Sequence, residues 1–224
     1  SWAGAAEAVK TLAAGLLSLG IQPEQRVAIA SNTRIEWLYA DLAVMCAGAA
    51  TTAVYPSTTA DDVLFILADS ETRIVFAEDD AQIEKLRQNR EHLPHLVQVV
   101  TFDGTADGEW VLSLADLEAR GARHLVEHPT SVDDAVAAVG PEHLATLIYT
   151  SGTTGRAKGV ELPHRCWTYL GAGAQGIGIL RSDDLQYLWL PLSHSFGKML
   201  AAVQLQVGFP SVVDGRIDKI VDNL

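Results

Sequence analysis

Short apolar segments alternate with helical segments along this chain, and the alternation limits the folds that it can adopt. Residues 26–30, 51–55, 73–77 and 96–101 are short and apolar, as expected of buried strands. The segments between them, at 34–48, 61–69 and 80–92, are predicted to be helices. Strands that alternate with helices of roughly 10–15 residues are typical of a parallel sheet. We therefore expect an α/β fold with a mainly parallel β-sheet flanked by helices.

The rest of the chain continues this pattern. Apolar residues recur at helical spacing from Trp2 to Leu19, and Gly20 ends that helix. No strand is predicted between 128 and 142, and no linker divides the chain, so we expect one compact unit. The further predicted elements are a helix at 112–120, a strand at 144–148, a helix at 163–171, a strand at 185–190, a helix at 194–208 and a strand at 210–213.

Composition excludes some classes of function. A chain of 224 residues buries roughly 70% of its unfolded surface, so it needs no disulfides, and Cys46 and Cys166 are expected to be reduced packing residues. The net charge of −12 argues against a broad basic face, so we expect no nucleic-acid partner. Any bound anion must be neutralised locally.

A loop rich in glycine, serine and threonine supplies such a local site. Its sequence is Tyr149-Thr150-Ser151-Gly152-Thr153-Thr154-Gly155-Arg156-Ala157-Lys158-Gly159-Val160. Glycines let the backbone approach a ligand closely, consecutive amides form a concave anion site, and Lys158 adds a positive charge. The loop is not a Walker A motif, because no serine or threonine follows the lysine. It predicts phosphate binding, and the alternative is an ordinary surface loop.

A second segment of interest runs from Leu190 to Gly197, between a predicted strand and a predicted helix. It contains Pro191-Leu192-Ser193-His194. On the residues alone, Ser193 would cap the helix and His194 would be an exposed side chain at a turn.

Together the two segments resemble the adenylate-forming enzymes, which include acyl-CoA synthetases, luciferase and peptide-synthetase adenylation domains. The loop matches their phosphate-binding signature except at Ala157, where proline is usual. In this family a Pro-Leu-x-His segment follows the loop, and here His194 comes 36 residues after Lys158 (194 minus 158). The wider sequence, including residues 32–37 and 213–220, looks most like bacterial long-chain fatty-acyl-CoA synthetases.

The resemblance implies a ligase with two steps. ATP and a fatty acid give an acyl-adenylate and pyrophosphate, and coenzyme A then displaces AMP to form a thioester. It places Lys158 against the pyrophosphate, assigns Mg²⁺ binding to Thr153, and puts His194 near the reacting carboxylate, so Lys158 and His194 are the predicted catalytic residues. The residues assigned to the β- and γ-phosphates are Thr150, Ser151, Gly152, Thr153, Thr154 and Gly155.

The resemblance also predicts how much of such a ligase is present. The family's adenine-binding motif, ribose-binding aspartate and C-terminal lysine are not found after His194. We therefore expect residues 1–224 to be part of the N-terminal AMP-binding domain and to be inactive alone. An exposed surface where the remainder belongs would favour self-association into homo-oligomers.

We expect a cytoplasmic protein without a transmembrane segment. No signal peptide opens the chain, and the longest apolar run, at 42–50, is far short of the roughly 20 residues that span a bilayer. Peripheral contact with a membrane, to collect a fatty acid, remains compatible with this.

The sequence leaves three alternative functions open. One is a ligase of the same family for aryl, short-chain or amino acids. Another is a non-catalytic module that binds a nucleotide or a partner. The third is a zinc site at His124, Glu127 and His128, which match a His-x-x-Glu-His pattern, although Pro129 ends the helix at once and no third ligand follows.

Overall fold

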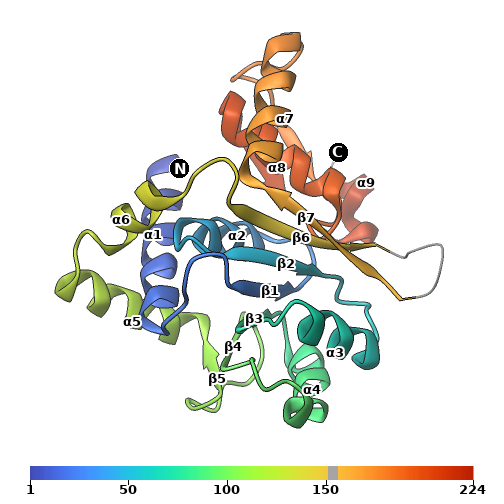
Figure 1. The fold of residues 1–224 in the computed structure, drawn as a ribbon. Coiled ribbons are helices and arrows are strands. Elements are labelled where there is room, and N and C mark those ends of the chain that lie inside the picture. Colours follow the sequence, from blue (N-terminus) through green and yellow to red (C-terminus); the bar gives the residue numbers. More distant parts are fainter. Residues whose placement is uncertain (151–155, 224) are drawn as a thin grey trace.

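A seven-stranded sheet forms the centre of the protein in a computed structural model that describes residues 1–150 and 156–223 (Figure 1). The strand order is β5-β4-β3-β1-β2-β6-β7, and every neighbouring pair is parallel except β6 and β7. The predicted α/β fold with a mainly parallel sheet is confirmed. The strands are β1 (Arg26–Ala30), β2 (Ala50–Val54), β3 (Ile74–Ala77), β4 (Gln98–Thr101), β5 (Val111–Ser113), β6 (Leu144–Thr150) and β7 (Lys158–Pro163).

Helices cover both faces of this sheet (Figure 1). Val27 and Ile29 of β1 join a core cluster with Trp37 of α2, whereas Ala28 and Ala30 join the cluster under α3 and α4. This division follows from the period of two along a strand, which sends alternate side chains to opposite faces. The helices are α1 (Trp2–Ser18), α2 (Ile35–Cys46), α3 (Ala60–Asp69), α4 (Asp80–Gln88), the short η1 (Arg90–His92), α5 (Leu114–Glu127) and α6 (Ser131–Ala138).

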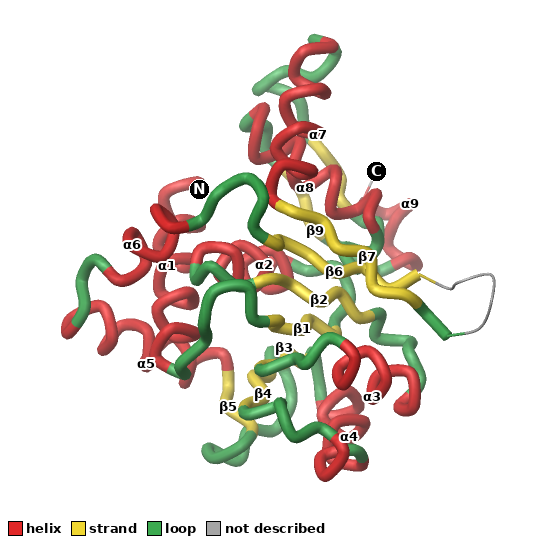
Figure 2. The backbone as a smooth tube through the Cα atoms, viewed as in Figure 1, coloured by secondary structure: helices red, strands yellow, loops and turns green. Residues whose placement is uncertain are grey.

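The last part of the chain forms a smaller layer beside β6 and β7 (Figure 2). Its two-stranded parallel sheet pairs β8 (Gln186–Leu188) with β9 (Ser211–Val213). Trp167 of α7 packs on Ala145 and Ile148 of β6, together with Met199 of α8. The helices of this layer are α7 (His164–Ile177), α8 (Ser195–Val207), η2 (Ile217–Lys219) and α9 (Ile220–Asn223).

Three local predictions were wrong or incomplete. Residues 158–163 form the strand β7, which was not predicted because the segment has no apolar run. Exposed charged residues such as Lys158 and Glu161 are typical of an edge strand. The helix predicted at 112–120 begins at Leu114 after β5, where the side chains of Ser113 and Asp116 form a capping box. Residues 128–142, for which no strand was predicted, contain the helix α6.

The structure also describes both cysteines and the helices that could be tested for spanning a membrane. Cys46 and Cys166 are both free thiols, as predicted. Within residues 1–150 and 156–223, no helix has the length and apolar character needed to cross a lipid bilayer.

Candidate active site

The strands β6 and β7, which flank the predicted phosphate loop in sequence, pair as an antiparallel hairpin. Thr150 and Lys158 are directly opposite each other in the antiparallel register, and both are exposed. The two described ends of the loop therefore present a hydroxyl and an ammonium group at one edge of the sheet. The predictions for Ser151, Gly152, Thr153, Thr154 and Gly155 fall outside the described residues.

Side chains of α3 contact the hairpin at the end where the loop begins. The Tyr149 hydroxyl donates to the Asp69 carboxylate at 2.6 Å, and the Tyr149 ring meets Phe65 edge to face. Burial, followed by the hydrogen bond to Asp69, raises the pKa of Tyr149 above its ordinary value. The Arg156 guanidinium lies 5.2 Å from the centre of the Phe65 ring. These contacts fix where both arms of the loop leave the sheet.

The turn before His194 is held against the end of β1. The Thr33 hydroxyl donates to the Leu190 carbonyl at 2.7 Å and accepts from the Leu192 amide at 3.1 Å. A Cβ atom at Gly197 would collide with the Pro191 carbonyl oxygen, so only glycine lets the first turn of α8 approach this closely. The loop between β1 and α2 thus positions the segment that carries His194.

His194 is the N-cap of α8 and is exposed. Its Nδ1 accepts a hydrogen bond from the Phe196 amide at 3.2 Å. In the neutral imidazole the proton is then on Nε2, which is left as a donor toward solvent. Among the described residues, no hydrogen bond or ion pair joins His194 to Thr150 or Lys158, so the structure does not bring these predicted site residues into direct contact.

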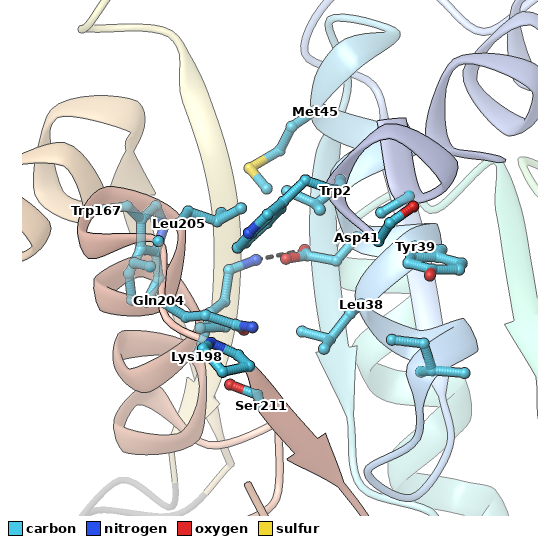
Figure 3. Close-up of a pocket in the computed structure, with 18 residues that line it drawn as sticks. Trp2, Leu38, Tyr39, Asp41, Met45, Trp167, Lys198, Gln204, Leu205 and Ser211 are labelled. Carbon is cyan, nitrogen blue, oxygen red and sulfur yellow. Dashed lines mark hydrogen bonds and ion pairs between the residues drawn. The ribbon is translucent and has the colours of Figure 1, made fainter. Parts of the chain in front are cut away.

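A cavity of about 380 Å³ lies between α2 and α8 (Figure 3). Lys198 is one helical turn beyond His194, and α8 forms one wall of the cavity from Lys198 to Leu205. The walls are mainly apolar and include Trp2, Leu38, Leu42, Met45 and Leu205. Its size falls within the usual range for pockets that bind small molecules.

A buried ion pair crosses the cavity between α8 and α2 (Figure 3). The Lys198 ammonium donates to Oδ1 of Asp41 at 2.5 Å, and the Thr51 hydroxyl donates to the same oxygen at 2.7 Å. The side chains of Lys198 and Asp41 are only 4% and 6% exposed. Because buried charges are costly unless paired, both residues depend on this contact.

Aromatic rings surround the Lys198 ammonium. Nζ lies 5.7 Å from the centre of the Trp37 ring and 5.4 Å from that of Trp167. Both distances suit a cation–π interaction, which partly replaces lost hydration. Burial nevertheless lowers the pKa of Lys198, and the Asp41 carboxylate opposes this shift. On α7, burial and then the Lys198 charge lower the pKa of His164.

Sequence reasoning did not identify Lys198 or Asp41 as site residues. Lys198 is the single charged residue of α8, and Asp41 lies in the otherwise apolar part of α2 that follows Glu36. The two charges have opposite signs. That combination is the signal that would have found them, because a charge on an apolar helix face needs a partner when the helix is buried.

The alternative zinc site finds no support among the described residues. The rings of His124 and His128 are 4.8 Å apart at the end of α5. Within the described part of the chain, no group of three or more histidine, cysteine, aspartate or glutamate side chains is placed to hold a metal ion. Two histidines alone do not complete the coordination of zinc.

Comparison with protein families identifies the chain. The sequence profile of a family described as "AMP-binding enzyme" matches residues 1–221. The chain belongs to the AMP-binding enzyme family. This family comprises adenylate-forming ligases, which use ATP, so the resemblance seen in the phosphate loop is confirmed.

Curated relatives of this member of the AMP-binding enzyme family include fatty-acid ligases. The "Long-chain-fatty-acid--CoA ligase FadD15" proteins of Mycobacterium bovis and Mycobacterium tuberculosis are each 34% identical over 215 residues. The match covers 93% of this chain and 35% of each relative, so the chain spans about a third of their length. A "3-[(3aS,4S,7aS)-7a-methyl-1,5-dioxo-octahydro-1H-inden-4-yl]propanoyl:CoA ligase" of Mycobacterium tuberculosis is also 34% identical, over 85% of this chain and 37% of its own.

Solved structures confirm the fold. The anthranilate CoA ligase AuaEII, in complex with anthranoyl-AMP, superposes with a TM-score of 0.82 at 21% identity, over 98% of this chain and 40% of its own. A long-chain-fatty-acid-CoA ligase (FadD1) from Archaeoglobus fulgidus gives 0.81 at 24% identity, over 96% and 40%. ATP-bound MatB from Rhodopseudomonas palustris gives 0.76 at 24% identity, over 99% and 42%.

Proposed function

We propose that the protein containing these residues activates a fatty acid with ATP to an acyl-adenylate and then transfers the acyl group to coenzyme A. In this proposal, residues 1–224 form part of its N-terminal AMP-binding domain. The observation that carries the proposal is the family's phosphate-binding sequence on a hairpin that sets Thr150 opposite Lys158. The long-chain class of substrate is supported by the names of the FadD15 relatives.

The hairpin would bind the triphosphate. The loop Thr150 to Gly155 supplies hydroxyls and amides, and the exposed ammonium of Lys158 stands across from Thr150. This donor set fits a phosphate chain, because hydrogen bonds to a charged group contribute about 1.5–3 kcal/mol each. Thr153 is the residue proposed to help hold Mg²⁺, and a hydroxyl is a suitable oxygen ligand. When bound, the ion neutralises charge on the phosphates.

His194 would act on the reacting groups from the start of α8. Its Nδ1 is engaged by the Phe196 amide, so Nε2–H is the donor available to an oxygen that gains negative charge. The hydrogen bonds of Thr33 to the preceding turn hold this donor in place. Preorganisation of this kind lowers the barrier, because no reorientation is needed as charge develops.

The cavity between α2 and α8 would receive the acyl chain. It lies along α8 from the turn after His194, so a carboxylate near His194 would have its chain beside Lys198 and Leu205. Ligases for aryl, short-chain or amino acids remain the second candidate. The name of AuaEII shows an aromatic acid accepted by a protein of the same fold, and the dioxo-indenyl ligase shows an oxygenated ring acid.

Acid-dependent exchange of pyrophosphate into ATP tests this proposal. The natural protein that contains these residues would be assayed with a series of fatty acids and with anthranilate. We expect exchange with fatty acids, and the absence of exchange with every acid would reject the proposal. His194→Ala should lower the rate by about 100- to 1000-fold, as for loss of one preorganised donor. The matched variant Ser195→Ala should retain the rate.

A further inference from the structure

The ion pair in the cavity offers hydrogen-bonding groups that its own contacts do not use. Lysine has three N–H donors, and within the described residues Nζ of Lys198 makes one hydrogen bond, to Asp41. Both hydrogen bonds to Asp41 from described residues fall on Oδ1, which leaves Oδ2 as an acceptor. Lys198 and Asp41 both line the cavity. The pair therefore presents unused donors and an unused acceptor side by side.

A hydroxyl group on a ligand can bind both to the free donors of Lys198 and to the free acceptor of Asp41. It accepts a hydrogen bond from an ammonium and donates one to a carboxylate, whereas a ketone oxygen only accepts. A plain hydrocarbon does neither, so it would cover the charged pair without replacing any hydrogen bond to water. The remaining walls are apolar and suit a chain.

We infer that the cavity takes fatty acids that carry a hydroxyl group on the chain, with Lys198 and Asp41 as the residues that determine this preference. The inference rests on the proposed function, because it assigns the substrate class of the same acyl site. Lys198 follows His194 by four residues, about 6 Å along the helix axis. The favoured hydroxyl is therefore expected nearer to the carboxylate than to the terminal methyl group.

The test compares dodecanoic acid with hydroxydodecanoic acids that differ in the hydroxylated carbon. The kcat/KM for acyl-CoA formation would be measured with the natural protein that contains this chain. At least one hydroxy acid should exceed dodecanoic acid by roughly 10- to 100-fold, which corresponds to one hydrogen bond to a charged group. Equal or lower values for every hydroxy acid would overturn the inference while leaving the proposed function in place.

Variants separate specificity from a purely structural role. The double variant Asp41→Leu/Lys198→Met replaces both charges with apolar groups, so it leaves no charge unpaired. We expect the ratio of hydroxy acid to dodecanoic acid to fall to about one, through loss of the hydroxy substrate. A structural role alone would change both substrates equally and keep the ratio, which would contradict the inference.

A control with the same substitutions comes from the exposed pair Lys10–Asp133. The variant Asp133→Leu/Lys10→Met should keep the wild-type ratio. If no acid of any kind yields acyl-CoA, the proposed function itself fails. The comparison of substrates in the wild-type protein needs no variant, so it decides the inference even where the double variant does not fold.

Discussion

The lysine–aspartate pairs Lys10–Asp133 and Lys198–Asp41 each join two helices that are distant in the sequence, and their surroundings differ sharply. Lys10 of α1 meets Asp133 of α6 at 2.9 Å, with side chains that are 40% and 66% exposed. Lys198 of α8 meets Asp41 of α2 at 2.5 Å, with side chains that are 4% and 6% exposed. The charges are the same in both pairs. The comparison therefore isolates what burial does to an ion pair.

Exposure to water determines how much each ion pair contributes to the free energy of unfolding. An exposed pair gains little, because solvent already stabilises both charges and salt screens their attraction. A buried pair has lost that solvation, so each charge depends on its partner and on neighbours such as Thr51. Two apolar side chains would fill the same space at lower cost. Stability alone therefore does not account for a charged pair beside the cavity, whereas the inferred role in ligand recognition does.

The largest expected effect is that of breaking the buried pair. Lys198→Met removes the cationic partner of the buried Asp41 carboxyl group, so we expect a loss of about 3–5 kcal/mol in the free energy of unfolding. Urea denaturation of the wild type and the variant measures this loss. A change below about 1 kcal/mol would mean that the buried pair behaves like an exposed one.

Removing both buried charges should reverse most of that loss. For Asp41→Leu/Lys198→Met we expect a free energy of unfolding equal to the wild type or higher by about 1–4 kcal/mol. The same denaturation curves give the coupling energy between the two positions. A double variant as unstable as Lys198→Met would show that packing, rather than an unpaired charge, explains the single variant.

The buried pair should also make stability depend on alkaline pH. Burial lowers the pKa of Lys198 below its ordinary 10.5, so between the two values the unfolded chain binds more protons than the native protein. Stability from this group therefore rises with pH up to about 10.5, with a slope of at most about 1.4 kcal/mol per pH unit.

To measure this pH effect, the free energy of unfolding of Asp41→Leu/Lys198→Met is subtracted from that of the wild type at each pH. The subtraction removes the contributions of groups that both proteins share. The charge of Lys198 also acts on His164 of α7, and the lowered pKa of His164 places its titration below this window. If the wild-type value minus the variant value falls as pH rises toward 10.5, the pKa of Lys198 is not lowered in the native protein.

Breaking the exposed pair should have the smallest effect. Lys10→Met should cost about 0.2–1 kcal/mol at low salt and less at high salt, because counter-ions screen exposed charges. Denaturation at two salt concentrations measures both values. A loss as large as that for Lys198→Met would remove the distinction between the two pairs.

Much of the fold followed from the sequence, because the buried parallel strands are short apolar runs between helices. Residues 26–30 and 73–77 illustrate this, since β1 and β3 lie within one residue of those bounds. β7 did not follow, because an exposed edge strand such as 158–163 has no apolar pattern. Its pairing with β6 is a long-range property that local spacing does not encode.

The candidate site was predictable where it is a contiguous motif. The phosphate loop and His194 could be proposed from the sequence because each belongs to a short contiguous motif. Lys198 and Asp41 were missed because 157 residues separate them and only the packing of α8 on α2 brings them together. The cavity is formed by side chains from several elements, so no single segment of the sequence indicates it.

Photoaffinity labelling tests most directly whether the cavity with the buried pair is the acyl site. A fatty acid with a diazirine on its chain would be irradiated with the protein, and the labelled peptides would be identified by mass spectrometry. We expect labels on residues 35–46 of α2 and 195–207 of α8, and unlabelled substrate should compete with this labelling. Labels that avoid both helices, or that persist under competition, would contradict it.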